Sequence, residues 1–371
     1  MTIPSAAATW PAVLNRLLAG TDLDEGDAAW AMTSILTGEA TAAQIAGFVV
    51  ALRAKGETPG EVNALVSAML GQARPLDLGA GGPAVVLDVV GTGGDQSHSV
   101  NISTMAALVC AAAGAPIVKH GNRAASSSTG TADVLEELGV AIDLEPDDVA
   151  RSLMEAGIGF CYAPTFHPAL RHAGPSRREL GVPTVFNILG PLTNPAFARS
   201  ALIGCASPIL APVMADVLRR RGVRALVVRG DDGLDEISTA ATTQVWDVTS
   251  PTVDHVVLDP TEIGVARVDP TLLRGGDRQR NAELLRKALG AVDPSDPDAE
   301  QVGAIVDAVA LNAAAALVAY AAAVADEPTP SDVPLADRIA AHLPTTRSVL
   351  ASGSALALLE RWVVVTQALR R

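Results

Sequence analysis

Aromatic residues are scarce in this sequence, since Phe, Trp and Tyr together make up 3% of its 371 residues. Apolar residues still account for 49% of the chain, so a hydrophobic core has to be built mainly from Ala, Val, Leu and Ile. Charged residues are also few, at 18%. A chain this apolar and this weakly charged is typical of a globular protein, and its length predicts two domains at ~150 residues each.

Basic residues are fewer than acidic ones in this sequence. The sequence has 27 Lys and Arg against 41 Asp and Glu, which gives a formal net charge of −14 and a pI near 4.8. A surface that binds nucleic acid needs a basic footprint for the phosphates. The composition therefore argues against a nucleic-acid partner.

Cysteine is rare, and signals for export or membrane insertion are missing. Cys110, Cys161 and Cys205 are an odd number at wide spacing, which we interpret as buried thiols in the reducing cytoplasm. The start of the chain lacks the basic and apolar regions of a secretion signal. Residues 308–325 are apolar but mostly alanine, and they include Asn312. We therefore predict a buried helix there and no membrane association.

The first 78 residues show helical periodicity without a strand-like run. Thr41 and Gln44 have the spacing of a capping box, and so do Thr58 and Glu61, where proline takes the first helical position. We therefore predict that residues 1–78 form a small all-helical domain.

After a Gly- and Pro-rich linker at 76–83, short β-branched runs alternate with helical stretches. This alternation predicts that residues 83–371 form a larger α/β domain, with a mainly parallel central sheet flanked by helices. Residues 167–195 interrupt it with a polar, basic segment punctuated by proline. The expected strands are 84–90, 116–119, 140–144, 159–163, 200–205, 225–229 and 243–247, and the expected helices are 104–113, 132–138, 212–221, 281–289 and 302–324.

A glycine-rich loop, Gly91–Asp95 (GTGGD), follows the first expected strand. Successive amides in such a loop form an anion-binding concavity, although a tight strand-to-helix turn is the alternative. The spacing is that of neither a dinucleotide fingerprint nor a P-loop. Asn101–Thr104 (NIST) then opens a helix whose N-terminus favours anions and whose hydroxyls can bind a metal.

A second polar loop, Lys119–Thr131, follows the next strand and contains three serines and two glycines beside its cations. It is predicted to be another phosphate cradle, although Ser128 or Thr129 can equally be a simple helix N-cap. Loops after consecutive strands of a βα sheet lie side by side, where open α/β sheets bind ligands. A ligand with phosphates at both ends fits two such loops.

Four carboxylates follow the expected strand 225–229, at Asp231, Asp232, Asp235 and Glu236. Oxygen-only ligands suit Mg²⁺ that also bridges substrate phosphates, whereas the alternative is a solvated turn.

The irregular segment carries further polar residues. His167, His172, Arg177 and the pair Arg178–Glu179 all lie within it. Its arginines can bind a planar carboxylate bidentately, although structural or surface roles are the alternative for these residues.

Taken together, the motifs resemble the anthranilate phosphoribosyltransferase family of tryptophan biosynthesis. The resemblance implies transfer of the phosphoribosyl group of phosphoribosyl pyrophosphate (PRPP) to the amine of anthranilate, with release of pyrophosphate. It also implies a homodimer formed through the helical domains, to which helices from about 175–195 return. The motifs are GTGGD at 91–95, NIST at 101–104, KHGNR at 119–123, HP at 167–168, RRELG at 177–181, VFNILGPLTNP at 185–195 and GLDE at 233–236.

The same resemblance implies roles for individual residues. It places two Mg²⁺ ions on Ser103, Asp235 and Glu236, and anthranilate on Gly91, Asn122 and Arg177. It assigns catalysis to positioning, favouring Lys119, Asn122 and Arg177, without a certain acid or base. Many members carry threonine where this chain has Ser99, which keeps the hydroxyl. PRPP is implied to contact Gly91, Gly94, Asp95, Ser99, Asn101, Ile102, Ser103, Thr104, Lys119, His120, Gly121, Asn122, Arg123, Ala124, Ala125, Ser126, Ser127 and Thr131.

Three other functions are weighed against this one. A pyrimidine nucleoside phosphorylase of the same fold has no need of the acidic motif. A type I phosphoribosyltransferase requires a phosphate-binding turn directly after Asp231 and Asp232, and that turn is missing. A non-catalytic relative that binds nucleic acid conflicts with the net charge of −14.

Overall fold

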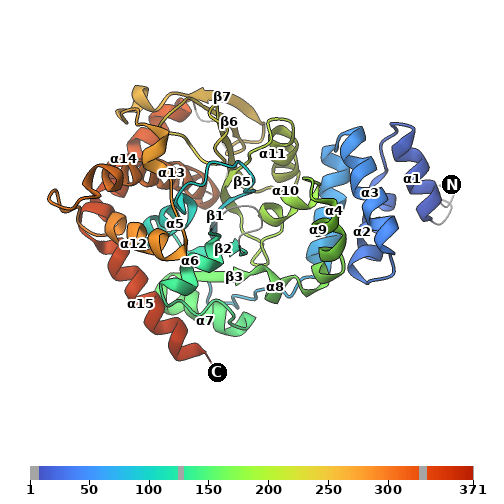
Figure 1. Ribbon diagram of the computed structural model, residues 1–371, viewed down its shortest axis with the longest axis horizontal. Helices are drawn as coiled ribbons and strands as arrows, with labels where there is room; N and C mark the ends of the chain where they lie inside the picture. The colour runs from blue at the N-terminus through green and yellow to red at the C-terminus, as the bar shows by residue number, and fades with distance from the viewer. Residues whose placement is uncertain (1–7, 124–128, 326–331, 371) are drawn as a thin grey trace.

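The N-terminal end of the chain folds into a helical bundle in this computed structural model, which describes residues 8–123, 129–325 and 332–370. The bundle lies at one end of the molecule, at the right of Figure 1, and the α/β domain fills the rest. The all-helical unit expected from the sequence is confirmed. Its helices are α1 (Trp10–Leu18), α2 (Glu25–Leu36), α3 (Ala42–Lys55) and α4 (Pro59–Gly71).

Both predicted capping boxes are present at the starts of α3 and α4. The backbone N–H of Glu61 donates to Thr58 Oγ1 at 3.3 Å, and Glu61 Oε2 accepts from the Thr58 backbone at 2.9 Å. Glu61 is buried, and its carboxylate also pairs with Lys55 Nζ at 2.9 Å and accepts from the Leu23 backbone at 2.9 Å. One capping residue therefore also ties the bundle together.

The α/β domain is built on one seven-stranded sheet with the order β3-β2-β1-β4-β5-β6-β7. The neighbours from β3 to β5 pair in parallel, and β6 and β7 are added antiparallel. The prediction of a mainly parallel sheet is confirmed. The strands are β1 (Leu87–Gly91), β2 (Ile117–Gly121), β3 (Ile158–Tyr162), β4 (Ser200–Gly204), β5 (Arg224–Gly230), β6 (Thr243–Asp247) and β7 (Asp254–Leu258).

Two details of the sheet differ from expectation. Residues 140–144 are buried apart from Asp143 but do not form a strand, because this segment is held against α15 (Ser354–Leu369), where Thr366 Oγ1 accepts from the Ala141 backbone at 3.2 Å. The edge strand β7 was not expected, since its exposed Asp254 and His255 hide the apolar pattern of a strand.

Alternate residues of β1 face two different layers. Leu87 and Val89 join the core formed with α5 (Ile102–Ala112), α13 (Ala299–Val324) and the C-terminal helices. Val90 joins the core on the opposite face of the sheet. Asp88 lies on that same face, because residues two apart in a strand point to the same side. The remaining helices are α6 (Thr131–Glu137), α7 (Pro146–Ala156), α8 (Ala163–Phe166), α11 (Leu210–Arg220), α12 (Arg278–Leu289) and α14 (Leu335–Ala351), with 3₁₀ turns η2 (Pro260–Ile263) and η3 (Pro270–Leu273).

Helix α13 is long and apolar enough to cross a membrane by length and composition alone. In the structure, 83% of its most apolar window is buried inside the molecule. It packs against α5, α14, β4 and β5. The expected buried helix is therefore confirmed.

The irregular segment 167–195 lies against the N-terminal bundle. It contains η1 (Pro168–His172), α9 (Gly174–Leu180) and α10 (Phe186–Leu192), which contact α2, α3 and α4 respectively. The chain thus crosses between the bundle and the α/β domain three times, once after α4 and then before and after this segment. The first and last crossings are joined directly, because the Leu76 backbone donates to the Pro195 carbonyl at 3.0 Å.

Candidate functional site

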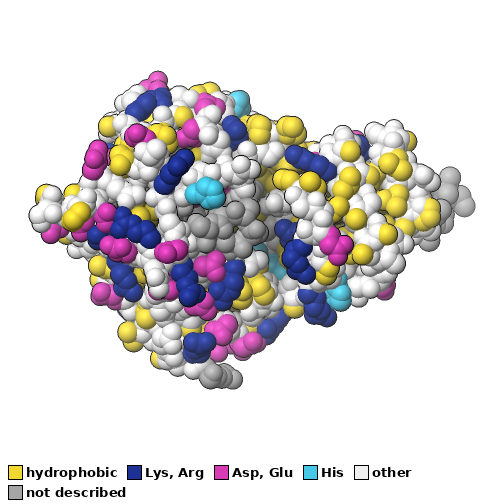
Figure 2. All heavy atoms as spheres, viewed as in Figure 1, with side chains coloured by type: hydrophobic (Ala, Val, Ile, Leu, Met, Phe, Trp, Pro, Cys, Tyr) yellow, Lys and Arg dark blue, Asp and Glu magenta, His cyan; other side chains and the backbone are white. Residues whose placement is uncertain are grey.

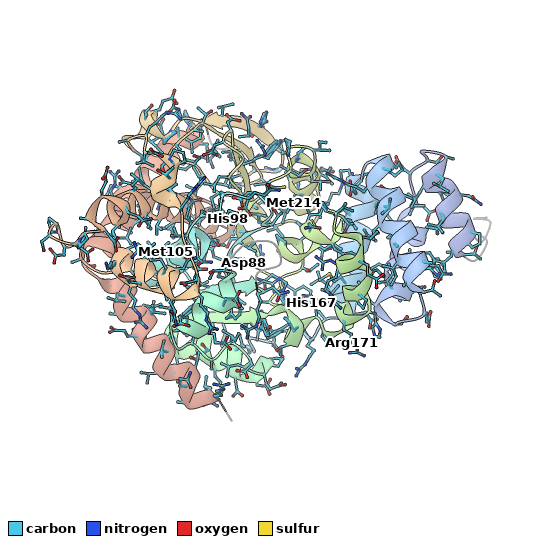
Figure 3. All side chains as sticks on the ribbon, viewed as in Figure 1. Asp88, His98, Met105, His167, Arg171 and Met214 are labelled. Atoms are coloured by element: carbon cyan, nitrogen blue, oxygen red, sulfur yellow. The ribbon has the colours of Figure 1, made fainter. Side chains whose placement is uncertain are left out.

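The predicted polar loops meet at the carboxyl ends of the parallel strands. β1 pairs with β2, so the loop after Gly91 lies beside the loop after Gly121. β4 alone separates β1 from β5, which is followed by the acidic segment. This edge of the sheet faces α9 and α10, and Figure 3 shows His98, Asp88 and His167 in the middle of the molecule. Open α/β sheets bind their ligands at such an edge.

Asp235 and Glu236 are hydrogen-bonded to both elements of the first loop region. Asp235 Oδ2 accepts from the Gly93 backbone at 2.7 Å, and Glu236 Oε1 accepts from the Ser103 backbone at 3.1 Å. Both carboxyl side chains are buried, at 9% and 7% exposure. The other two acids of the segment turn elsewhere, with Asp231 against Thr242 and Gln244, and Asp232 against Ser238.

Two glycines make this approach possible. A Cβ on Gly204 would lie 1.5 Å from the Asp235 carbonyl oxygen, and a Cβ on Gly91 would lie 2.4 Å from Asp235 Oδ2. The ends of β4 and β1 therefore touch the backbone and carboxylate of residue 235 without an intervening side chain. The function of these glycines is close packing rather than backbone freedom.

Lys119 lies beneath the loops rather than in solvent, with 2% exposure. Its Nζ donates to the Val89 carbonyl and to Ser103 Oγ, the latter at 3.3 Å. Burial lowers the pKa of the Lys119 ammonium, and the negative charges of Asp88, Glu236 and Asp235 oppose that effect. The charge of one buried cation thus interacts with the charges of three buried acids.

The acidic pair has the chemistry of a magnesium site completed by substrate. Burial raises the pKa of Asp235 well above its usual value, and it raises the pKa of Glu236 to about 7. A divalent cation would offset the repulsion between the two neighbouring carboxylates and stabilise both of them in the ionised form. Within the described ranges, no three His, Cys, Asp or Glu side chains are arranged to hold a metal. Mg²⁺ commonly uses one or two carboxylates plus substrate phosphates, so the residues fit this ion.

The glycine-rich loop continues as an irregular segment up to α5. Asp95 accepts from the hydroxyl and backbone of Ser97 at 2.6 and 3.3 Å, and Ser97 Oγ accepts from the Ser99 backbone at 3.3 Å. Gln96 and His98 both have positive φ, at 60° and 53°. This segment therefore leaves the sheet as an irregular loop in which side chains bond to the loop's own backbone.

The second loop is described only in part. Ala124, Ala125, Ser126 and Ser127 lie outside the described residues, as does Ser128. The Asn122 carbonyl accepts from the Ala132 backbone at 3.2 Å. The Arg123 guanidinium pairs with Asp133 at 3.1 Å and Glu136 at 2.9 Å, so it points toward α6 in this structure. Thr131 Oγ1 accepts from Thr104 Oγ1 at 3.4 Å, which joins the two loops.

Two buried histidines lie between the sheet and the irregular segment. Their ring centroids are 5.0 Å apart, and their partners are the Gly190 carbonyl for His120 Nδ1 and the Thr193 carbonyl for His167 Nε2, both at 2.9 Å. Burial lowers the pKa of His120 to about 3 and of His167 to about 4. Both rings are therefore neutral near pH 7. The half-buried His172 lies apart from them, beside Gly38 at the end of α2.

Arg177 on α9 lies over the ring of Phe186, with its guanidinium carbon 5.2 Å from the ring centroid. Burial lowers the pKa of Arg177. No carboxylate among the described residues pairs with it, whereas the neighbouring Arg178 is exposed. A partly desolvated guanidinium without an internal anion is suited to a ligand carboxylate.

Sequence reasoning missed several residues that support these loops. Asp88 is 1% exposed and accepts from the His120 backbone at 3.2 Å and from Asn194 Nδ2 at 2.8 Å. A carboxylate inside an otherwise apolar strand was a readable signal for it. Asn281, described below, gave no such signal, because one asparagine near the start of an expected helix is an ordinary observation.

Comparison with known proteins is consistent with this architecture. The helical bundle domain of a glycosyl transferase family matches residues 11–73, and the a/b domain of a glycosyl transferase family matches residues 83–356. An anthranilate phosphoribosyltransferase of Saccharopolyspora erythraea is 52% identical over 356 residues, covering 96% of this chain and 95% of the relative.

Two solved structures extend the comparison. The anthranilate phosphoribosyltransferase of Thermus thermophilus superposes with a TM-score of 0.84 at 41% identity, covering 96% of this chain and 99% of that one. The Saccharomyces cerevisiae enzyme in complex with PRPP and Mg gives 0.83 at 26% identity, covering 98% and 99%. With both domain models matched and half of the residues identical over nearly full length, this chain belongs to the anthranilate phosphoribosyltransferase family.

Proposed function

We propose that this protein transfers the phosphoribosyl group of PRPP to the amine of anthranilate, giving N-(5-phosphoribosyl)anthranilate and pyrophosphate in tryptophan biosynthesis. The observation that carries the proposal is the contact of Asp235 and Glu236 with Gly93 and Ser103. It builds an acidic pair into the loops that family membership assigns to the phosphates. A nucleoside phosphorylase has no need of that pair.

Mg²⁺ is proposed to be held by Ser103, Asp235 and Glu236, with two ions present when PRPP is bound. When bound, the metal stabilises the negative charge of the departing pyrophosphate. The buried Lys119 ammonium lies beside Ser103 and contributes charge of the same sign. Glu236 orients the Ser103 backbone through its hydrogen bond, so the start of α5 is fixed before the substrate arrives.

PRPP is proposed to bind across the two loops after β1 and β2. Backbone amides of Gly91–Asp95 and the α5 N-terminus supply donors that need no reorganisation, which is the source of electrostatic stabilisation in such sites. Ser99 and Thr131 add hydroxyls on either side. The remaining proposed contacts are Ile102, Thr104, His120, Gly121, Asn122, Arg123 and the residues 124–127.

Anthranilate is proposed to contact Gly91, Asn122 and Arg177. The planar Arg177 guanidinium matches a carboxylate, and α9, which carries it, packs against α3 of the bundle. The aromatic amine is a neutral nucleophile, so attack on ribose C1 does not require prior removal of a proton by a strong base. Catalysis then comes mainly from aligning two substrates and excluding water.

The replacement Arg177→Ala is expected to raise the KM for anthranilate by about 30-fold or more and the KM for PRPP by less than about threefold, because hydrogen bonds to a charged partner contribute roughly 1.5–3 kcal/mol. Steady-state kinetics with each substrate varied in turn measures this. The control is Arg178→Ala, which removes an exposed arginine from the same helix. Equal effects of Arg177→Ala on both KM values would exclude it as a carboxylate contact.

The protein is further proposed to act as a cytoplasmic homodimer. Figure 2 shows hydrophobic side chains gathered over the bundle end of the molecule, and Leu18 of α1 and Val50 of α3 are 76% and 43% exposed. Exposed apolar patches of this kind mark association surfaces. The three cysteines are buried free thiols, which fits the reducing cytoplasm.

The proposed activity is tested by the loss of anthranilate fluorescence when the full-length protein is mixed with PRPP and Mg²⁺, with and without EDTA. We expect a loss that requires both PRPP and the metal. Folded protein that leaves the fluorescence unchanged would overturn the proposal, and phosphorolysis of a pyrimidine nucleoside would then be assayed in the same preparation.

A further inference from the structure

A closed ring of hydrogen bonds joins the two phosphate loops to the start of α12. Asn281 is 3% exposed; its Oδ1 accepts from the Gly276 backbone at 2.7 Å, and its Nδ2 donates to Asn101 Oδ1 at 3.1 Å. Asn101 Nδ2 donates to the Thr129 carbonyl at 3.4 Å. Thr129 Oγ1 closes the ring by donating to the Gly276 carbonyl at 3.2 Å.

The direction of every bond in this ring is fixed by the backbone. The Gly276 amide can only donate, so the oxygen of the Asn281 amide faces it and the nitrogen faces Asn101. At the other end the Thr129 carbonyl can only accept, so the nitrogen of Asn101 faces it. The side chain at each position must therefore accept on one side and donate on the other, which an amide can do and an ionised carboxylate cannot.

Asn101 is diverted from its ordinary role by this arrangement. It is the N-cap residue of α5, yet its side chain makes no capping hydrogen bond to that helix. The segment before α12 also follows the backbone of the first loop, with Leu273 accepting from Val100 and His98 accepting from Gly275, both at 2.9 Å. The first loop is thus attached by its backbone to the segment before α12 and by a side chain to α12 itself.

We propose that Asn281 is a positioning residue for PRPP binding. Its hydrogen bonds fix the loop after β1 relative to the loop after β2. The inference rests on the proposed function, and it adds to that function a residue from a helix that supplies none of the proposed substrate contacts. Asn281 acts through Asn101 and Thr129. Loss of the Asn281 side chain would let the two loops separate. Binding of a ligand that must contact both loops would then be weaker, whereas the Arg177 side of the cleft would be unchanged.

The test uses two variants of the full-length protein. Asn281→Asp keeps the acceptor for Gly276 and places a second acceptor against Asn101, and rotating the Asn101 amide only moves the conflict to the Thr129 carbonyl. Asn281→Ser removes both bonds without adding charge. We expect both variants to raise the KM for PRPP about tenfold and to leave the KM for anthranilate within about twofold. The Kd of PRPP with Mg²⁺, measured by calorimetry, is expected to rise by the same factor.

The matched control is Gln301→Ala. Gln301 Nε2 donates to the Arg274 carbonyl at 2.9 Å, so this variant removes a bond to the same segment outside the ring. It is expected to leave both KM values unchanged. The inference is overturned if Asn281→Ser lowers the melting temperature while both KM values stay within twofold, or if both rise equally. Absence of turnover in the unmodified protein would instead refute the proposed function, and the calorimetric Kd would still decide the role of Asn281.

Discussion

Replacing Asp235 by Asn together with Glu236 by Gln is expected to lower kcat at least about 100-fold, the effect of losing ligands that orient a catalytic metal. The amide oxygens can still accept from Gly93 and Ser103, so the loops keep their positions while the charge of the proposed Mg²⁺ site is lost. The rate is measured against Mg²⁺ concentration at saturating PRPP and anthranilate. An unchanged Mg²⁺ titration would remove both residues as ligands.

The same double variant should be more stable than the unmodified protein when no metal is present. The pKa of Glu236 is raised to about 7 in the folded state by burial. A carboxyl whose pKa is higher in the folded than in the unfolded state lowers the free energy of unfolding once the unfolded chain ionises. This loss of stability grows as the pH rises from about 4.5 to 7 and is complete above the folded pKa. A higher melting temperature at pH 8 in EDTA is therefore expected. The exposed Asp231→Asn is the control, and it should neither raise the melting temperature nor alter the Mg²⁺ dependence.

The replacement Gly204→Ala is expected to be severely damaging, because the added methyl group clashes with backbone. The new Cβ would lie 1.5 Å from the carbonyl oxygen and 2.4 Å from the carbonyl carbon of Asp235, and no side-chain rotation relieves a clash with backbone. We expect the free energy of unfolding to fall by about 3 kcal/mol, the upper end for overpacking. Activity should be lost as well, because the Asp235–Glu236 backbone must move to admit the methyl group.

Urea unfolding and the fluorescence assay together measure this effect. The control is Gly303→Ala in α13, where nothing lies within 4 Å of the added Cβ. That variant should gain roughly 0.5–1 kcal/mol, since alanine is the better helix former. Normal stability and activity in Gly204→Ala would show that β4 does not support the acidic pair.

The sequence predicted the motifs more reliably than their contacts. Gly-rich loops after buried strands could be placed at one sheet edge because parallel strands end on the same side. Which two of the four acids turn inward could not be decided from composition; the family resemblance named Asp235 and Glu236, and the hydrogen bonds from Gly93 and Ser103 show that these two face the loops. The ring through Asn281 joins residues 180 positions apart, and no local pattern encodes such a distance.

Secondary structure was mispredicted where tertiary contacts overrode local preference. Residues 140–144 have the composition of a strand, but a side chain of α15 satisfies the Ala141 amide, and Ala141 and Leu144 join the same hydrophobic cluster as Val118 and Cys161 of the sheet instead of pairing with a strand. β7 forms despite its polar residues because it is an edge strand, which needs one neighbour and one apolar face. The polar character of 167–195, in contrast, correctly marked a segment outside the regular alternation.

The repeated crossing of the chain between its two parts also sets an order of events during synthesis. Helices α1–α4 share a hydrophobic core with α10 and α11. About 140 residues separate the end of α4 from the start of α11, which at ~5–20 residues per second is a delay of roughly 7 to 30 s on the ribosome. During that interval the first helices have emerged without the surface they pack against. Their apolar faces are then exposed, so we expect the folding yield to depend on the rate at which residues 72–210 are translated.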